Sequence, residues 1–436
     1  MRGILTIPFK NAERLADQLC RWSSMELYSL VLRGNNDKLC SDAFPKYSRY
    51  DVLAAFGAES IIVPNENYFD ELRKATAQND WLFGYLGYDL KNEVERLSSS
   101  NLDGLSFPKM LFFKPSIVFA VKEGIVNIYY SKDKYNRQTA GSLFDAIMVA
   151  PPVKGENDKD FIPQARFTKE DYVDAISRVL KRIHRGDIYE MNLCQEFYAT
   201  PYRINPFETY LKLNQISPTP FSAFGKFLDK FLLCASPERY LQKVGDRVVS
   251  QPIKGTCSRG KTEEEDCQLA DKLRNDPKER AENVMIVDLV RNDLSRVAQR
   301  GSVKVDELCG VYPFPQVHQM ISTISCQLDS KFDIIDLIKA TFPMGSMTGA
   351  PKVSAMQIIE EHERTRRGLY SGAIGYIDPQ GDFDFNVVIR SLLYNSTTRY
   401  MSYSVGGAIT SKSNPEQEYN ECLLKAKAIN QVLTSE

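Results

Sequence analysis

The sequence of 436 residues has no run of 18 apolar residues, which is about the length that a membrane-spanning helix needs. Its beginning, MRGILTIPFKNAERL, interrupts a short apolar run at Pro8 and continues with charges, which does not match a signal peptide. The nine cysteines form no CxxC pair, and their odd number does not suit a disulfide framework. The sequence therefore predicts a cytoplasmic protein with no membrane span and no cysteine-rich zinc site.

Neither sign of charge predominates, because 55 Lys and Arg residues stand against 56 Asp and Glu residues. The net charge of −1 generates no overall field that would attract nucleic acid or an anionic membrane. We expect neither of them as a partner. An anionic ligand would have to be held by local cations.

The grouping of the expected strands and helices favours an α+β fold. Hydrophobic residues make up 43% of the chain and charged residues 25%, which is typical of a globular protein. Residues 1–150 show mixed strand and helix patterns, and residues 150–164, rich in Pro, Gly and charge, are the best candidate for a linker. We expect strands over 81–90, 110–121, 383–395 and 398–410, and helices that begin behind Thr168, break at Pro277 and begin behind Asn414.

Two pairs of glutamates are spaced three residues apart in segments expected to be helical, Glu279 with Glu282 and Glu418 with Glu421. This spacing places both carboxylates of a pair on one helix face. Most such pairs are solvated, and acidic residues near a helix start are favoured by the helix dipole. If the two pairs face each other, they form a hard oxygen site suited to Mg²⁺. Both interpretations stay open on the residues alone.

Lys254 lies in QPIKGTCSRG, residues 251–260, between Pro252, which cannot donate to a sheet ladder, and Gly255, which allows close approach. It is a solvated loop residue, a cation that holds an anion, or a nucleophile. GSMTGAPK (345–352) lacks the ending of a Walker A loop and indicates either an ordinary loop or close approach to an anionic ligand. The adjacent glycines of VGGAIT (405–410) indicate a bulge or a close ligand.

Three cationic positions can be interpreted from their neighbours in the sequence. Arg390 lies in an apolar segment expected to be a strand, VVIRSLL, where it needs a carboxylate or similar partner only if it faces inward. Lys425 follows Glu421 at the spacing of an i,i+4 ion pair. RTRRG (364–368) predicts an exposed basic turn.

Seven motifs occur in a fixed order along the chain: SPERY, PIKGT, KERAENVMIVDLVRNDLSRV, FPMGSMTGAPK, RRGLYSGAIGY, FNVVIRS and NPEQEYNECLLKAKA. The series resembles the chorismate-binding enzymes, which include component I of anthranilate synthase, component I of aminodeoxychorismate synthase, and the isochorismate and salicylate synthases. The resemblance implies a catalytic domain over 165–436 and an N-terminal portion, 1–150, packed into the same fold. It implies an α+β fold of two large packed antiparallel sheets flanked by helices.

The resemblance also implies an Mg²⁺-dependent enzyme that acts on chorismate. Glu238, in SPERY, matches the general acid that protonates the departing 4-hydroxyl. The four glutamates Glu279, Glu282, Glu418 and Glu421 match the metal ligands. The positions implied to contact or adjoin the substrate are Gly255, Thr256, Ser346, Tyr370, Arg390, Gly406 and Lys425.

Lysine in PIKGT resembles aminodeoxychorismate synthase component I, because anthranilate synthases usually have alanine there. The implied reaction is amination of chorismate at C4 to 4-amino-4-deoxychorismate, which feeds p-aminobenzoate and folate. The Lys254 amine, its pKa lowered by burial, would attack C2 and expel the 4-hydroxyl before ammonia adds at C4. The alternatives are a clamp role for Lys254, an anthranilate synthase component I, and a non-catalytic chorismate-binding regulatory subunit.

Four positions depart from the family's usual residues. Glu190, in IYEMNL, stands where isochorismate and salicylate synthases have a water-activating lysine and amine-adding members more often have glutamine. Gln319 replaces a frequent histidine, Ser346 a frequent threonine, and Ala408 the second glycine of a G-x-G turn. The chain has no G-x-C-x-G motif of a glutamine amidotransferase, which implies a separate glutaminase partner or free ammonia.

Overall fold

The computed structural model of the protein describes residues 2–36, 38, 47–153, 155, 157–158 and 162–434. Part of the candidate linker over 150–164 lies outside the described residues, at positions 154, 156 and 159–161. The division of the chain at this segment therefore stays a prediction.

Strands dominate the fold, and all the pairings between them are antiparallel. The strands of the described residues are β1 (Arg2–Pro8), β2 (Tyr28–Arg33), β3 (Val52–Ile62), β4 (Leu82–Leu86), β5 (Met110–Lys122), β6 (Ile125–Ser131), β7 (Gln164–Ala165), β8 (Glu190–Ala199), β9 (Phe221–Phe227), β10 (Lys230–Ser236), β11 (Arg239–Val244), β12 (Arg247–Gln251), β13 (Ile253–Ser258), β14 (Lys304–Pro313), β15 (Val317–Gln327), β16 (Gly349–Ala350), β17 (Ala373–Ile377), β18 (Phe383–Val387), β19 (Ser391–Asn395) and β20 (Tyr400–Thr410).

Helices lie between groups of strands and at the C-terminal end. The helices of the described residues are α1 (Ala12–Trp22), α2 (Tyr68–Thr76), α3 (Lys91–Val94), α4 (Arg137–Met148), α5 (Lys169–Arg185), α6 (Pro206–Ile216), α7 (Glu263–Asn275), α8 (Pro277–Ser295), α9 (Ile334–Thr341), α10 (Lys352–His362) and α11 (Pro415–Thr434), with 3₁₀ turns η1 (Ser23–Met25), η3 (Tyr88–Leu90) and η4 (Gly345–Met347).

Three helix boundaries follow local signals in the sequence. Thr168 caps α5, because its side chain accepts a hydrogen bond from a backbone N–H of the first turn. Asn414 caps α11 in the same way. Pro277, where we expected the helical pattern to break, is the first residue of α8, a position at which its missing N–H costs nothing. These predictions are confirmed.

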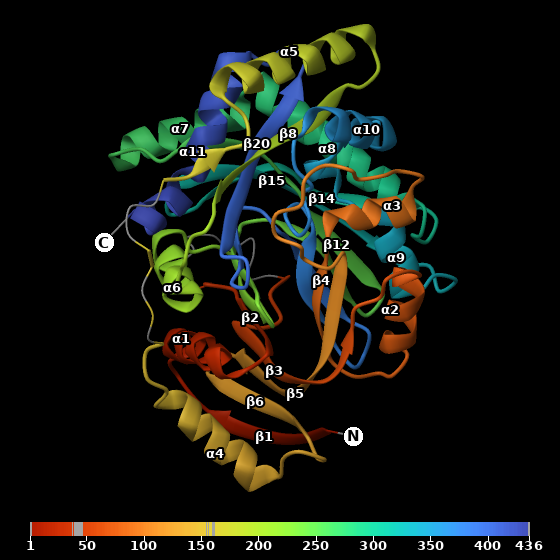
Figure 1. Ribbon diagram of the computed structural model, residues 1–436. Helices are drawn as coiled ribbons and strands as arrows, with labels where there is room; N and C mark the ends of the chain where they lie inside the picture. Colours follow the sequence, from red (N-terminus) through yellow and green to blue (C-terminus); the bar gives the residue numbers. More distant parts are fainter. Residues whose placement is uncertain are drawn as a thin grey trace.

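The strands join into one continuous sheet that curls around an apolar core. β2 pairs with β9, and β4 pairs with β17, so strands from before and after the candidate linker share the sheet. Figure 1 shows α1 and α4 beside β1 and β6 at one end, and α5 and α11 beside β8 and β20 at the other. The predicted α+β class, with antiparallel strands and flanking helices, is confirmed, but the two large sheets that we expected are joined through shared strands into one.

Aromatic side chains fill the core where strands face one another. The ring of Phe113 on β5 lies 6.2 Å from that of Phe83 on β4 and 6.5 Å from that of Phe227 on β9. A second apolar cluster packs the outer faces of the strands against helices α1, α4, α5 and α11, with Leu15 and Tyr172 fully buried. Each large apolar side chain buried in this way contributes about 1.5–3 kcal/mol.

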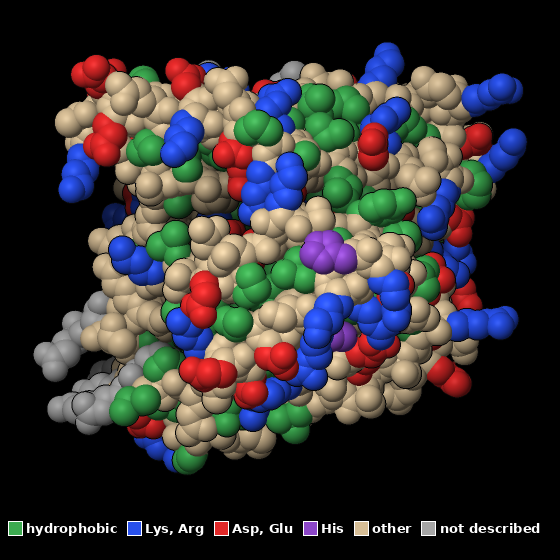
Figure 2. All heavy atoms as spheres, turned by 90° about the horizontal axis from the view of Figure 1, so that it is seen from above, with side chains coloured by type: hydrophobic (Ala, Val, Ile, Leu, Met, Phe, Trp, Pro, Cys, Tyr) green, Lys and Arg blue, Asp and Glu red, His purple; other side chains and the backbone are tan. Residues whose placement is uncertain are grey.

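The surface agrees with the near-zero net charge of −1. In Figure 2, basic and acidic side chains are interspersed over the face seen from above, and neither sign covers it. None of the helices in the described part of the chain has the length and apolar character needed to span a membrane.

Candidate functional site

One cavity gathers residues from distant parts of the chain. It is bordered by β8, β13, β15, β20, α8, α11, the β10–β11 turn, the η4 segment and the loops that flank β17 to β19. All thirteen residues singled out in the sequence line it: Glu238, Lys254, Gly255, Thr256, Glu279, Glu282, Ser346, Tyr370, Arg390, Gly406, Glu418, Glu421 and Lys425. The roles assigned to these residues remain predictions.

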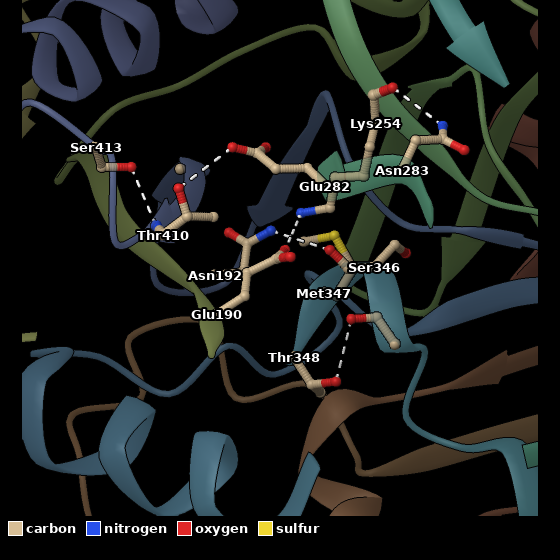
Figure 3. Close-up of polar contacts among 12 residues, drawn as sticks. Glu190, Asn192, Lys254, Glu282, Asn283, Ser346, Met347, Thr348, Thr410 and Ser413 are labelled. Carbon is tan, nitrogen blue, oxygen red and sulfur yellow. Dashed lines mark hydrogen bonds and ion pairs between the residues drawn. The ribbon is translucent and has the colours of Figure 1, made fainter. Parts of the chain in front are cut away.

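A β-bulge sets the position of Lys254. The register between β13 and β15 shifts between Ile253 and Thr256, and Gly255 takes a φ of +97°, which favours glycine. The carbonyl of Lys254 accepts a hydrogen bond from Asn283 on α8 at 3.2 Å, and that contact holds the bulged strand against the helix (Figure 3). Only 10% of the lysine side chain is exposed, so it is not a solvated loop residue.

The Lys254 ammonium is paired with a carboxylate that sequence patterns did not assign. Its Nζ lies 2.8 Å from Oε1 of Glu190, at the start of β8 (Figure 3). Burial alone would lower the pKa of Lys254, but Glu190, Glu282 and Glu238 together outweigh burial and raise it. The expectation of a lowered pKa is therefore wrong for this arrangement, because three carboxylates face the amine.

Glu238 lies in the turn between β10 and β11 and is only 3% exposed. Ser346 Oγ donates a hydrogen bond to its Oε1 at 2.5 Å. Burial raises the pKa of Glu238 to about 7, against the opposing effects of Ser346, Lys254 and Arg390. A carboxyl group with this pKa keeps a proton near neutrality and can give it to a leaving group.

The apolar surroundings of Arg390 predicted that it lies within a strand, and this prediction is wrong. It sits between β18 and β19 with a φ of +50°, so the two strands are separate. With its amide oxygen toward Arg390, Gln319 accepts hydrogen bonds from Nη1 at 3.0 Å and Nη2 at 2.7 Å. Burial lowers the pKa of Arg390 to about 10, so the guanidinium stays charged at neutral pH. Since Gln319 is neutral, the positive charge remains available to an anionic ligand.

The glycines of VGGAIT allow another side chain to approach the backbone closely, and they do not form a bulge. β20 pairs with β8 in unbroken register through Gly406 and Gly407. A Cβ at Gly407 would lie 3.2 Å from Oε2 of Glu418, so the glycine leaves room for that carboxylate. Lys425 donates a hydrogen bond to the carbonyl of Gly406 at 2.9 Å and also forms the expected ion pair with Glu421 at 2.9 Å.

Glutamates of α8 and α11 face one another across the cavity. The ammonium of Lys278 lies 3.8 Å from Oε1 of Glu282 on α8 and 3.6 Å from Oε1 of Glu418 on α11. One carboxylate from each helix therefore faces the same positive charge. Lys278 was not singled out in the sequence, although it lies within the motif that contains Glu279 and Glu282.

The pKa values of these glutamates differ with their surroundings. Burial raises the pKa of Glu279, and it raises that of Glu282 to about 7 despite the nearby Lys254. Lys425 lowers the pKa of Glu421 by its charge. Crowded carboxylates with raised pKa values are stabilised when a cation enters among them.

The donor set fits a hard divalent cation, although the side chains are not arranged around one. Among the residues described, no three carboxylate, imidazole or thiol groups stand close enough together to form a ready metal site. The Lys278 ammonium takes the place of a cation between Glu282 and Glu418. Carboxylate oxygens are the ligands that Mg²⁺ prefers, and it keeps some of its water.

Arg367 corrects the expectation of an exposed basic turn at 364–368. Arg364 and Arg366 are exposed, but Arg367 is buried and pairs with Glu363 at 2.7 Å. It also donates hydrogen bonds to the carbonyls of Met347 at 2.6 Å and Asn192 at 2.9 Å, two residues that line the cavity. Composition could not show this, because the burial arises only from tertiary packing.

We expect Arg367→Met to destabilise the fold by about 3–5 kcal/mol, because it leaves the buried Glu363 carboxylate without its partner. Chemical unfolding would measure the loss. The double variant Arg367→Met/Glu363→Gln removes both charges and should recover part of it. Equal stability of the wild type and the single variant would show that the pair contributes nothing.

A sequence profile described as chorismate binding enzyme matches residues 47–431. The chain is 35% identical over 413 residues to aminodeoxychorismate synthase component 1 of Escherichia coli, covering 88% of this chain and 89% of that one. It is 37% identical over 353 residues to anthranilate synthase component 1 of Thermus thermophilus, covering 79% and 76%.

Solved structures share the fold. The crystal structure of anthranilate synthase component I from Streptococcus pneumoniae superposes with a TM-score of 0.74 at 24% identity, covering 98% of this chain and 92% of that one. The isochorismate synthase MenF of Escherichia coli gives a TM-score of 0.77 at 19% identity, covering 100% and 95%. The profile match across most of the chain, together with relatives above 30% identity, shows that the protein belongs to the chorismate-binding enzyme family.

Proposed function

We propose that this enzyme aminates chorismate at C4 to give 4-amino-4-deoxychorismate, a precursor of p-aminobenzoate and folate. The observation that carries the proposal is the position of Lys254, whose amine lies buried in the cavity that also holds Glu238. Relatives named aminodeoxychorismate synthase component 1 support it, at 35% identity in Escherichia coli and 34% in Bacillus subtilis.

Chorismate carries two carboxylates, and the cavity offers separate cations for them. Arg390 keeps its charge while its guanidinium is bound to the neutral amide of Gln319, and Lys425 lines the cavity from α11. We assign the substrate carboxylates to these cations, with the Tyr370 hydroxyl beside them. The backbone at Gly255, Thr256 and Gly406 and the Ser346 hydroxyl would complete the contacts.

The reaction then follows from two side chains. The amine of Lys254 bonds to C2 of the ring, the ring double bonds shift, and the bond from C4 to its hydroxyl breaks. Glu238 protonates the departing hydroxyl, which leaves as water. Ammonia adds at C4, the double bonds shift back, and Lys254 leaves with the electron pair of its bond to C2. The covalent intermediate replaces one difficult substitution with two easier ones.

Glu279, Glu282, Glu418 and Glu421 would hold Mg²⁺, and Lys278 would move aside from its place between Glu282 and Glu418. When bound, the ion neutralises these carboxylates and supplies positive charge for a carboxylate of the substrate.

The relatives are named as components 1, so we propose a second component, a glutaminase that supplies ammonia. Free ammonia at high concentration would replace it in an assay. We place the activity in the cytoplasm, because the eight cysteines in the described part of the chain are free thiols.

Product analysis tests the proposal. The protein is incubated with chorismate, Mg²⁺ and ammonium, and the products are separated by chromatography with a parallel assay for pyruvate. We expect 4-amino-4-deoxychorismate without pyruvate release. Anthranilate with equimolar pyruvate would instead assign the chain to the anthranilate synthases, which are also among its relatives. No conversion of chorismate would support a non-catalytic binding subunit.

Glu238→Gln should lower kcat by about 10²–10⁴-fold and leave the KM for chorismate nearly unchanged, because the variant lacks the proton donor but keeps its size. The acid must be protonated to act, so wild-type turnover should fall as the pH rises through about 7, the pKa of Glu238. Initial rates across pH would show this limb in the wild type and its absence in the variant. Unchanged kcat with a much higher KM would make Glu238 a binding residue.

A further inference from the structure

The pair of Lys254 and Glu190 is unusual for its burial and for its incomplete hydrogen bonding. Glu190 is 1% exposed, and its Oε1 lies 2.8 Å from Nζ of Lys254. Its other oxygen, Oε2, is buried and has no hydrogen-bond partner among the residues that the structure describes. A buried carboxylate oxygen normally has such a partner, so this one has an unused capacity to accept a proton.

The backbone fixes Glu190 in place. It is the first residue of β8, where its neighbours are Thr410 of β20 on one side and Ala350 of β16 on the other. The N–H of Tyr189 donates to the carbonyl of Ala350 at 2.7 Å, so the strand is held at the point where the side chain departs. A side chain held in this way keeps its carboxylate at a constant distance from the amine.

Three carboxylates from different elements face the Lys254 amine: Glu190 from β8, Glu282 from α8 and Glu238 from the β10–β11 turn. Glu190 alone among the described residues lies within ion-pair distance of Nζ. In the proposed reaction, Glu238 must keep its proton for the leaving hydroxyl, and Glu282 belongs to the proposed metal set. Glu190 is the remaining acceptor.

We propose that Glu190 is a catalytic base that takes the proton from the Lys254 ammonium and so provides the free amine that attacks chorismate; the inference rests on the proposed function. An ammonium has no electron pair to donate, and Lys254 is held in that form by its carboxylate neighbours. One proton passes from Nζ to Glu190. The nitrogen then uses its electron pair to bond to C2, while Glu238 gives its own proton to the departing hydroxyl.

The cycle closes without an added reactant, because the ammonium that forms when ammonia bonds to C4 gives a proton back to Glu238. When Lys254 leaves C2, it departs with the electron pair of that bond as a neutral amine. Glu190 returns its proton to this amine, and the original ion pair forms again. Glu190 thus changes protonation state twice in each turnover and makes no contact with solvent, as its burial requires.

The test compares Glu190→Gln with the wild type in amination from chorismate, Mg²⁺ and ammonium. We expect kcat at pH 7 to fall about 100-fold or more, with little change in KM, because the amide cannot accept the proton. Below about pH 7, where Glu238 still carries its proton, the variant's kcat should rise with pH as a larger fraction of Lys254 loses its proton to solvent, and the wild type should show no such rise. Glu190→Asp, which keeps a carboxylate, should recover much of the activity with the wild-type pH dependence.

Glu196→Gln is the matched control. Glu196 lies on the same strand and is 5% exposed, but its ion-pair partner is Arg166, at 2.9 Å, and not Lys254. Its kcat should stay within about twofold of the wild-type value, because the effect sought is proton transfer and not the loss of a buried charge. Thermal unfolding shows whether both variants are folded. If Glu190→Gln is not folded, Glu190→Asp is used for the test in its place.

The outcomes separate this inference from the proposed function. If the wild type makes no 4-amino-4-deoxychorismate, the proposed function is wrong. If the wild type makes it and Lys254→Ala does as well, the covalent step is wrong. If both expectations hold but Glu190→Gln aminates chorismate as fast as the wild type or faster at pH 7, Glu190 only holds the ammonium in place, and the inference is overturned.

Discussion

Replacing Lys254 by alanine is expected to lower kcat for amination of chorismate with ammonium by more than about 10³-fold, because it removes the proposed nucleophile. The substitution also converts PIKGT to the PIAGT usual in anthranilate synthases. The products should therefore be analysed for anthranilate and pyruvate as well as for 4-amino-4-deoxychorismate. Rates with ammonium make the result independent of any partner.

Lys254→Arg separates a nucleophile from a clamp. A guanidinium keeps the positive charge and can pair with Glu190, but it stays protonated and does not attack carbon. A clamp would retain much of its activity in this variant, whereas the proposed nucleophile would retain almost none. Near wild-type turnover of either Lys254 variant would contradict the covalent role.

Lys243→Ala provides a matched control for these substitutions. Lys243 is buried to a similar degree on β11 and donates hydrogen bonds to the carbonyl of Gly381 at 3.2 Å and to Asp382 at 3.3 Å. It lies outside the cavity. We expect its kcat with ammonium to remain close to the wild-type value, even if its thermal stability falls.

Glu418→Gln should abolish amination and weaken Mg²⁺ binding by more than about 100-fold, because it removes a buried proposed ligand while preserving its shape. Calorimetric titration with Mg²⁺ alone measures the binding without any turnover. Wild-type activity should disappear in excess chelator and return when Mg²⁺ is added.

Glu416→Gln is the control for the metal prediction. Glu416 lies on the same helix but is exposed and pairs with Lys169 at 2.7 Å, outside the cavity. Its Mg²⁺ affinity and kcat should match those of the wild type. Full wild-type activity in excess chelator, or unchanged Mg²⁺ binding by Glu418→Gln, would exclude the proposed metal site.

Local chemistry predicted the helix boundaries because it acts within a few residues. The hydroxyl of Thr168 and the amide of Asn414 each satisfy backbone N–H groups of the turn that follows, and Pro277 fits only the first turn of its helix. These contacts need no tertiary structure, so the sequence was sufficient to predict them.

The prediction that the site residues meet in one cavity came from the order of the motifs along the chain and not from any local pattern. Spacing placed Glu279 beside Glu282 and Glu418 beside Glu421, but it left open whether the pairs faced solvent or each other. The structure brings Glu282 and Glu418 to the same ammonium group of Lys278. Only tertiary packing decides this, namely the packing of α8 against β13, β14 and β15 and of α11 against β20.

Three predictions failed because the outcome depended on distant neighbours. The pKa of Lys254 is raised because Glu190, on another strand, reaches its amine. Arg390 has a positive φ and interrupts the strand that its apolar neighbours in the sequence had predicted. Arg367 is buried by its pairing with Glu363 and by carbonyls from two other segments. The burial of these positions is not encoded in their sequence neighbours, even for Arg367, whose partner Glu363 lies only four residues before it.

The most direct test of the covalent mechanism is the mass of the protein after rapid mixing with chorismate and Mg²⁺ in the absence of ammonium, followed by quenching and peptide mapping. We expect a gain equal to the mass of chorismate minus one water, located on Lys254, absent from Lys254→Ala and lost when ammonium is added before quenching. Rapid amination with ammonium in a parallel sample, with no modified Lys254 at any quench time, would contradict the covalent mechanism.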